Sequence, residues 1–490
     1  MNKKQNRRSF LKSTLAATAT VSWTAKSWSQ VKGANEYVRC ATIGVNGRGK
    51  SHMSYVDGLN PEGVKMVALC DVDAKVLARS VDRYKKKDKN SPVEGENDMR
   101  RLFDRKDIDV ITVATPNHWH SLAAIWAIQA GKDVYVEKPV SHNVWEGRQL
   151  VRAARKYGKI CQTGTQARSS HCIREAVKYV QEGNLGKIKV ARGLCYKLRP
   201  SIGHTNAPQK VPDYVDYNLW SGPAPLVPPT RNNPSKGPIH YDWHWVWHYG
   251  NGDLGNQGIH QMDISRWFLG EDGLSPRVWS VGGRMGYVDD GETPNTQIVY
   301  HDYEKAPLVF EVRGLTAAPK NKDRPTYKGA SVGVIVECEK GYVAVRNYGS
   351  VQAYDWKDNK IKEWKGSVNH FENFINAVHS RKHTDLNADI WEGHLSSALC
   401  HTGNISYRLG AHASVEKIED AIKPDYDASG AFDRMEEHLG IHSIDLKKTP
   451  LTLGPALNMD PKVEKFIGNT DADALLRREY RKPFVVPDRV

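Results

Sequence analysis

The chain has 490 residues, of which 39% are hydrophobic and 26% are charged, and its formal net charge is +14. This length indicates two or three domains, and the composition excludes a disordered, collagen-like or disulfide-rich mini-protein. Residues 1–29 hold six Lys or Arg and no acid, so the remainder carries only +8. Since there is no long basic run, zinc finger or RNA-binding signature, nucleic acid is not expected as a partner.

Residues 1–29 have the pattern of an export signal. A charged start precedes a mildly apolar stretch, and Ser27 and Ser29 supply small residues around a possible cleavage site. Asn6–Lys12, NRRSFLK, is similar to the twin-arginine motif. An ordinary secretory signal or a basic tail is the alternative, but the weak hydrophobicity favours the twin-arginine pathway. We therefore expect export of the folded protein by the twin-arginine translocase to the periplasm or cell envelope.

The cysteines and the apolar runs restrict the architecture further. The seven cysteines are odd in number and no two are spaced as CxxC, so neither a disulfide framework nor a thiolate zinc site is expected. Most stand in apolar runs, which favours buried free thiols. No stretch reaches the roughly 18 uncharged apolar residues of a membrane span.

Residues 30–165 predict a doubly wound parallel sheet, because apolar strands alternate with helical patterns. Strands are expected at Val38–Gly44, Val64–Cys70, Ile108–Thr115, Asp133–Glu137 and Lys159–Gly164, and helices from Lys50, at Ser121–Ala130 and at Val144–Tyr157.

A glycine-rich turn, Gly44-Val45-Asn46-Gly47-Arg48-Gly49, follows the first strand, and Asp71 ends the second. Glycines let a backbone approach a pyrophosphate, and a helix N-terminus stabilises its charge. Asp71 can accept hydrogen bonds from both adenosine ribose hydroxyls and would repel a 2′-phosphate, so NAD is favoured over NADP. Asn46 replaces the middle glycine of GxGxxG but tolerates positive φ, and Arg48 could stack on adenine or meet a phosphate. Taken alone, the loop could be an ordinary glycine turn.

Two motifs follow the third and fourth strands, Thr115-Pro116-Asn117-His118-Trp119-His120 and Glu137-Lys138-Pro139. Ligands of open α/β sheets bind beyond the carboxyl ends of the strands. The candidate contacts are Thr115, Asn117, His118, Glu137 and Lys138. A helix cap and a turn are the alternative interpretations.

These motifs, with a later GNQGIHQMD, resemble the Gfo/Idh/MocA family (glucose–fructose oxidoreductase, inositol dehydrogenase and rhizopine catabolism) over residues 38–410, and the start resembles its exported branch. The resemblance implies a Rossmann domain followed, over residues 166–410, by an α+β domain with a large open, mainly antiparallel sheet, often used for contacts in a homodimer or homotetramer. Strand patterns agree at Ile188–Tyr196, Arg277–Met285, Thr296–Tyr300, Leu308–Val312, Val332–Glu337, Tyr342–Arg346 and Val351–Tyr354, and helical patterns at Ile259–Leu269, Phe371–His379 and Trp391–Leu409.

The resemblance also implies catalytic roles. Lys138 would lie beside the nicotinamide and the substrate hydroxyl, where a cationic lysine stabilises a developing alkoxide. A cis bond would precede Pro139, and Asn117 and His118 would approach the ribose or nicotinamide.

Asn256, His260 and Asp263 have i, i+4, i+7 spacing and on a helix could face one cleft. His260 would be the general base, with a satisfied core histidine as the alternative. Asn256 departs from the family pattern, because an amide cannot take a proton. Either His260 works with Lys138 alone, or the chemistry differs.

The segment Tyr241–Tyr249 is rich in Trp, Tyr and His, which suits a sugar site; a buried aromatic cluster is the alternative. Trp243, His244, His248 and Asp263 are candidate substrate contacts, and Arg168 is placed at the same cleft. His244 and His248 are four residues apart, but no acid or thiolate pairs with them, so no metal site is predicted. Residues 411–490 are expected to wrap the core or a neighbouring subunit.

The leading hypothesis is an NAD-dependent oxidoreductase that takes a hydride from a sugar, polyol or glycoside hydroxyl and recycles a tightly bound cofactor. The alternative is an NAD-dependent redox-neutral glycosidase, which oxidises, eliminates, hydrates and re-reduces its substrate. A third hypothesis is a non-catalytic sugar- or nucleotide-binding protein.

Overall fold

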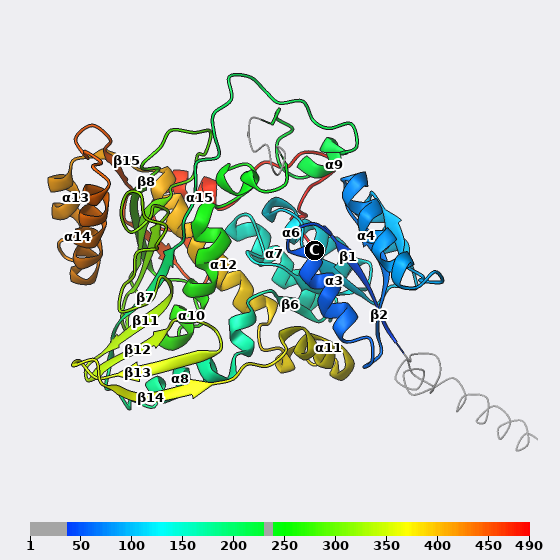
Figure 1. Cartoon of the computed structure of the whole chain (residues 1–490), viewed down its shortest axis with the longest axis horizontal. Helices are drawn as coiled ribbons and strands as arrows, with labels where there is room; N and C mark the ends of the chain where they lie inside the picture. The colour runs from blue at the N-terminus through cyan, green and yellow to red at the C-terminus, as the bar shows by residue number, and fades with distance from the viewer. Residues whose placement is uncertain (1–36, 230–238) are drawn as a thin grey trace, which may run out of the picture.

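The computed structural model describes residues 37–229 and 239–490, which form two α/β domains side by side (Figure 1). The export signal expected in residues 1–29 lies outside the described residues. In the described part, no helix is both long and apolar enough to cross a membrane. All seven cysteines are buried and free, as predicted.

The first domain is built on a six-stranded sheet in the order β3-β2-β1-β4-β5-β6, with every pairing parallel. The strands are β1 Val38–Ile43, β2 Val64–Cys70, β3 Glu94–Glu96, β4 Val110–Val113, β5 Asp133–Val136 and β6 Cys161–Thr163. Their β-branched and apolar side chains are almost all buried, as expected for strands covered on both faces. The predicted doubly wound sheet is confirmed. The sequence analysis missed β3, since Glu-Gly-Glu carries no apolar pattern.

The helices of this domain cover both faces of its sheet: α3 Gly49–Gly58, α4 Ala74–Lys87, α5 Met99–Asp104, α6 Asn117–Gln129, α7 Val144–Lys156 and, from later in the chain, α11 His370–Ser380. The register pairs Ile43 of β1 with both Cys70 and Val113, and Val113 with Val136. The carboxyl ends of β1, β2, β4 and β5 therefore meet at one edge, where the predicted motifs begin.

The second domain contains a large mixed sheet in the order β14-β13-β12-β11-β7-β10-β9-β8-β16-β15; β17 also pairs with β8, and β18 pairs with β17. Only β7 and β10 pair in parallel among these described strands, which confirms a mainly antiparallel sheet. The strands are β7 Ile188–Tyr196, β8 Arg277–Gly283, β9 Thr296–His301, β10 Leu308–Arg313, β11 Val332–Cys338, β12 Gly341–Val345, β13 Ser350–Tyr354, β14 Lys360–Lys365, β15 Ala411–Ala413, β16 Leu451–Leu453, β17 Leu457–Asp460 and β18 Lys465–Phe466. The charged edge strand β14 was not predicted.

Helices lie on both faces of the large sheet (Figure 1). On the side of the first domain are α8 His171–Gln181, α10 Ile259–Leu269 and α12 Ile390–Arg408. On the outer face, α13 Val415–Ile422 and α14 Tyr426–Ile441 pack Phe432 and Met435 against Trp279 and Tyr300. The chain itself therefore covers this part of the outer face.

The remaining elements connect the two domains: short helices η1 Gln166–Ser169, α9 Tyr217–Ser221, η2 Asp242–Trp245, η4 His383–Asp385 and α15 Thr470–Leu475, and the π-helical turn η3 Leu254–Gly258. The last residues run along the first domain of the same chain, where Phe484 packs on Trp119 with ring centroids 5.4 Å apart. Glu464 binds Arg148 of α7 and, at 2.7 Å, His394 of α12. Residues after 410 therefore join both domains.

Candidate active site

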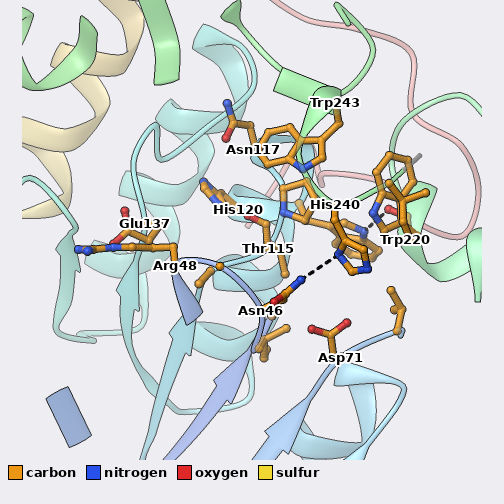
Figure 2. A pocket seen from close by; sticks show the side chains of 18 of the residues that line it. Asn46, Arg48, Asp71, Thr115, Asn117, His120, Glu137, Trp220, His240 and Trp243 are labelled. Atoms are coloured by element: carbon orange, nitrogen blue, oxygen red, sulfur yellow. Dashed lines mark hydrogen bonds and ion pairs between the residues drawn. The ribbon is translucent and has the colours of Figure 1, made fainter. Parts of the chain in front are cut away.

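A cavity of about 290 Å³ lies at the carboxyl edge of the first sheet, between the two domains (Figure 2). The first domain contributes the turn after β1, the end of β2 and the ends of β4 and β5. The lining residues there include most of the predicted cofactor contacts: Gly44, Asn46, Gly47, Arg48, Asp71, Thr115, Asn117, Glu137 and Lys138. Sequence reasoning therefore located this half of the site.

The glycine turn and Asp71 fit a dinucleotide. Gly47 has φ +48°, and a Cβ there would meet no heavy atom within 4 Å, so its backbone faces open space. Gly49, in contrast, does not line the cavity: a Cβ there would lie 1.8 Å from the carbonyl oxygen of Gly44, so it allows α3 to pack closely. The Asp71 carboxylate accepts hydrogen bonds from the backbone N–H groups of Val45 (2.9 Å) and Asp73 (3.0 Å), which hold it at the cavity wall. Burial raises its pKa.

Arg48 does not extend toward the end of β2 that carries Asp71. Its Nε donates to Oε1 of Glu137 at 2.6 Å (Figure 2). His52 contacts the same oxygen at 3.1 Å. Burial acts to raise the pKa of Glu137, but Arg48 and His52 hold it well below its usual range. Arg48 was expected to stack on adenine or to meet a phosphate; in this structure the buried carboxylate at the end of β5 binds its guanidinium, and the residue still lines the cavity.

Lys138 reaches from the first domain to the second. It follows β5, precedes a cis bond to Pro139, and its Nζ donates to the backbone carbonyl of Asn256 at 2.6 Å. Burial, with the charges of Arg48, Lys197 and Arg199, lowers its pKa to about 8. A lysine with this pKa can donate or accept a proton near neutral pH.

The motif around His260 differs from the expected regular helix. Asn256 lies in the π-helical turn η3, and α10 begins only at Ile259. Asn256 lines the cavity and holds Lys138 through its backbone, so its amide identity does not decide that contact. Burial, and next the charge of Lys138, lowers the pKa of His260 to about 3, which makes it a weak base.

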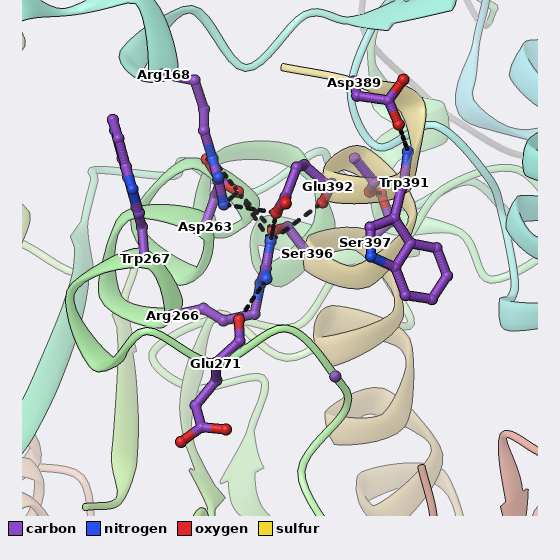
Figure 3. A network of polar contacts seen from close by, with 12 residues as sticks. Arg168, Asp263, Arg266, Trp267, Glu271, Asp389, Trp391, Glu392, Ser396 and Ser397 are labelled. Carbon is purple, nitrogen blue, oxygen red and sulfur yellow. Dashed lines mark hydrogen bonds and ion pairs between the residues drawn. The ribbon is translucent and has the colours of Figure 1, made fainter. Parts of the chain in front are cut away.

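Asp263 and Arg168 form a buried ion pair and do not line the cavity (Figure 3). Arg168 Nη2 lies 2.8 Å from Asp263 Oδ1, which also accepts from Ser396 Oγ at 2.6 Å. Glu392 and Arg266 complete the network. Both residues were expected at the substrate. The structure contradicts this expectation, because the guanidinium of Arg168 in η1 and the carboxylate of Asp263 in α10 pair with each other in the protein interior.

His118 was expected to contact the cofactor, but on α6 it is His120 that lines the cavity. His118 donates to the carbonyl of Trp220 at 2.8 Å, burial lowers its pKa to about 3, and it is not among the cavity residues. His120 lines the cavity and lies within 2.7 Å of the carbonyl oxygens of Pro139 and Thr115. The spacing of His120 from Asn117, one helical turn, is the signal that could have identified it.

Described residues between β7 and η3, within 197–229 and 239–253, supply the roof of the cavity. Trp220, Ile239, His240, Tyr241, Trp243 and His244 line it. His248 does not, and its ring lies beside that of Tyr249. Trp220, Trp243 and Tyr249 also form one hydrophobic cluster, so the cavity wall and the aromatic cluster are the same structure. No group of three or more potential metal-ligating side chains occurs in the described residues.

His240 fastens this roof to the first domain. Its Nε2 donates to Asp73 Oδ2 at 2.8 Å, and its Nδ1 lies 3.2 Å from the amide nitrogen of Asn46 (Figure 2). Backbone bonds join Ala74 to Tyr214 and Asp216 to Val72. The sequence analysis missed His240, because nothing local indicates a partner 167 residues away.

Fold and site together define a two-domain dinucleotide-dependent oxidoreductase. Residues 38–165 match the family model described as "Oxidoreductase family, NAD-binding Rossmann fold", and residues 170–435 the one described as "Oxidoreductase family, C-terminal alpha/beta domain". The chain belongs to the Gfo/Idh/MocA oxidoreductase family, and its first domain is the NAD-binding domain.

Curated relatives match over a short region. A "Glycosyl hydrolase family 109 protein 1" from Shewanella sp. strain ANA-3 is 39% identical over 129 residues, and an "Alpha-N-acetylgalactosaminidase" from Shewanella oneidensis is 37% identical. Each match covers 26% of this chain and 28% of the relative.

Solved structures share the fold over most of the chain. The WlbA dehydrogenase from Bordetella pertussis, in complex with NADH and UDP-GlcNAcA, has a TM-score of 0.54 at 19% identity and covers 74% of this chain and 93% of its own. A levoglucosan dehydrogenase with NADH and levoglucosan has a TM-score of 0.53 at 17% identity, covering 74% and 95%.

Proposed function

We propose that this protein is an NAD-dependent oxidoreductase that takes a hydride from a hydroxyl-bearing carbon of a sugar, polyol or glycoside. The observation that carries the proposal is the position of Lys138, whose ammonium extends from the NAD-binding domain to the second domain at the edge of the cofactor cavity. NAD bound at Gly44–Gly47 and Asp71 supplies the hydride acceptor, and these residues favour it over NADP.

Lys138 is better suited than His260 to exchange the hydroxyl proton. With a pKa of about 8, roughly a tenth of Lys138 is neutral at pH 7 and can accept that proton. Its ammonium form stabilises a developing alkoxide. His260, with a pKa of about 3, is neutral, and it is buried and not among the residues that line the cavity. In this proposal Asn117 and His120, which line the cavity, would contact the ribose or nicotinamide, and Trp243 and His244 would contact the sugar.

The roof of the cavity supports a retained cofactor. If NAD is bound at the glycine turn, the contacts of His240 with Asn46 and Asp73 would hold the roof beside it and would slow its release. A retained cofactor must be regenerated in place, so the oxidised substrate is re-reduced or a second substrate is reduced.

A redox-neutral glycosidase is the second candidate, and the relatives named as glycosyl hydrolases favour it. Oxidation of one ring carbon acidifies the neighbouring C–H. Loss of that proton expels the aglycone, water adds, and the returned hydride restores the alcohol. In this reaction the same Lys138 would serve the oxidation and the final reduction.

The proposal also includes the cellular location of the protein and its oligomeric state. The Asn6–Lys12 motif supports export by the twin-arginine translocase to the periplasm or cell envelope, with NAD loaded beforehand. A homodimer or homotetramer is the expected assembly. A reporter fused to residues 1–29 should be exported, and Arg7→Lys with Arg8→Lys should block this; light scattering measures the assembly.

The experiment that tests the function begins with protein purified without added cofactor. Denaturation should release close to one NAD(H) per chain. Glycosides and free sugars are then screened for reduction of the bound nucleotide and for release of the aglycone without external NAD. Aglycone release with no net NADH selects the glycosidase, and net NADH selects the dehydrogenase. If the protein takes up NAD but no sugar or glycoside reduces the bound NAD, both the dehydrogenase and the glycosidase proposals are contradicted.

A further inference from the structure

Among the described residues, two ammonium groups contact neighbouring residues of η3 without a carboxylate in ion-pair distance; Lys138 lines the cavity, and Lys197 is partly exposed beside it without being one of the lining residues. Lys138 Nζ donates to the carbonyl of Asn256 at 2.6 Å, and Lys197 Nζ donates to Oε1 of Gln257 at 3.0 Å. Asn256 and Gln257 are adjacent in η3, and both are partly exposed. Within residues 37–229 and 239–490, neither lysine makes an ion pair. Two like charges beside a partly enclosed cavity repel each other, so this arrangement is costly unless an anion joins them.

Lys197 belongs to the second domain, which under the proposed function would contact the substrate. It directly follows β7, at the centre of the second domain's sheet, whereas the glycine turn that would hold the pyrophosphate follows β1 of the first domain. The charge of Lys197 contributes to the lowered pKa of both Lys138 and His260, which agrees with its position beside the reacting centre. The NAD phosphates are therefore not its partner.

The acidic groups nearby are already engaged. Asp253 binds Arg199, whose Nε lies 2.7 Å from Oδ2, and Glu137 binds Arg48 and His52. Gln257 directs its amide nitrogen toward Gln261 at 3.4 Å, which leaves its oxygen for Lys197. The excess charge beside the cavity is therefore positive, and Lys197 is held in place by an amide that does not neutralise it.

We propose that the substrate carries an anionic group, the carboxylate of a sugar acid or a sulfate ester, and that Lys197 binds it. Lys197 would then bind the anionic group, and Lys138 would contact the reacting hydroxyl. An anion bound at Lys197 would also weaken the repulsion between the two ammonium groups. The inference rests on the proposed function and narrows its substrate class from sugars in general to anionic sugars.

The test compares the wild type, Lys197→Met and a control, Lys189→Met, which removes an exposed lysine from the same strand β7. The substrates are the α- and β-4-nitrophenyl glycosides of glucose and galactose, the matching uronides and the matching 6-sulfates. The measurements are KM and kcat for reduction of the bound nucleotide or nitrophenol release.

The wild type should prefer one anionic class over its neutral counterparts, and that class identifies carboxylate or sulfate. Lys197→Met should raise KM for it by about 10- to 100-fold, because one charge-assisted hydrogen bond is lost, and should change kcat by less than about threefold. KM for neutral glycosides, and all constants of the control, should stay unchanged.

Equal use of neutral and anionic substrates by the wild type would overturn the inference while leaving the proposed function intact. The inference would also be overturned if Lys197→Met changed KM equally for neutral and for anionic substrates, because Lys197 would then have only a structural role. If no glycoside of any class reacts, the proposed function fails first, and this inference fails with it.

Discussion

Replacing Lys138 with Met should abolish turnover without costing stability. The folded pKa of about 8 lies below the ordinary 10.5, so holding Lys138 protonated at pH 7 costs about 3 kcal/mol. Methionine removes this cost together with the hydrogen bond to Asn256, which is worth about 1.5–3 kcal/mol. The free energy of unfolding at pH 7 should therefore stay equal to the wild type or rise by up to about 1.5 kcal/mol.

Lys138→Met should lower the catalytic rate even though it does not lower stability. Loss of the proton-exchanging group should lower kcat by about 100-fold or more, while the released NAD(H) stays near one per chain. Denaturant titration, kinetics with the preferred substrate and nucleotide release are measured on the same preparation. The stability difference should also depend on pH: a lowered lysine pKa destabilises below about 8, and the wild type regains this free energy between about pH 8 and 10.5.

Lys132→Met is the matched control. Lys132 is also a buried lysine with a lowered pKa, but its Nζ donates to the carbonyls of Arg105 (2.5 Å) and Ile108 (2.9 Å) at the opposite end of the sheet. Its replacement should lower stability and leave kcat of the folded fraction unchanged. The reasoning would be refuted if Lys138→Met kept activity within about tenfold of the wild type, or if it lost its nucleotide.

Three further predictions concern the roof, the pH profile and the buried network. His240→Ala removes both contacts of the roof with the first domain, so NAD should leave at least about tenfold faster in a dilution assay; an unchanged rate would argue against a fastened roof. The kcat for alcohol oxidation should rise with pH through about 8, because only neutral Lys138 accepts the proton, and a profile that is flat there would exclude it as the base. Arg168→Met should lower the free energy of unfolding by about 3–5 kcal/mol, since Asp263 loses its main partner, while the KM of the folded enzyme stays constant; a selective rise in KM would return Arg168 to the substrate site.

The elements of the fold could be predicted because their signals are local. The apolar run of β2 was expected at Val64–Cys70 and is found there, and β7 and α10 also have the expected bounds. Elements without an apolar period, such as β3 and the charged edge strand β14, were missed. The cofactor half of the site was found for a similar reason: its residues follow strand ends, and parallel strands bring those ends to one edge.

The direction of individual side chains could not be predicted in the same way. His118 and His120 both belong to the motif after β4, but packing against Trp220 turns one away from the cavity and leaves the other facing it. Arg168 and Asp263 are 95 residues apart and pair only because η1 and α10 meet in the interior. The regular helix expected across Asn256 is instead a π-helical turn, which presents a backbone carbonyl to Lys138.

By itself, the sequence determined the two-domain order, the parallel sheet, the glycine turn with its acid, and Lys138 at the end of a strand. Periodicity and turn chemistry specify these features within a few residues of chain. Only the tertiary structure decided that described residues between β7 and η3 roof the cavity through His240. It also decided that Lys138 and Lys197 contact the adjacent residues Asn256 and Gln257, without an ion pair in the described part of the chain. Such contacts depend on which distant surfaces pack together, and the free energy that selects them is distributed over the whole core.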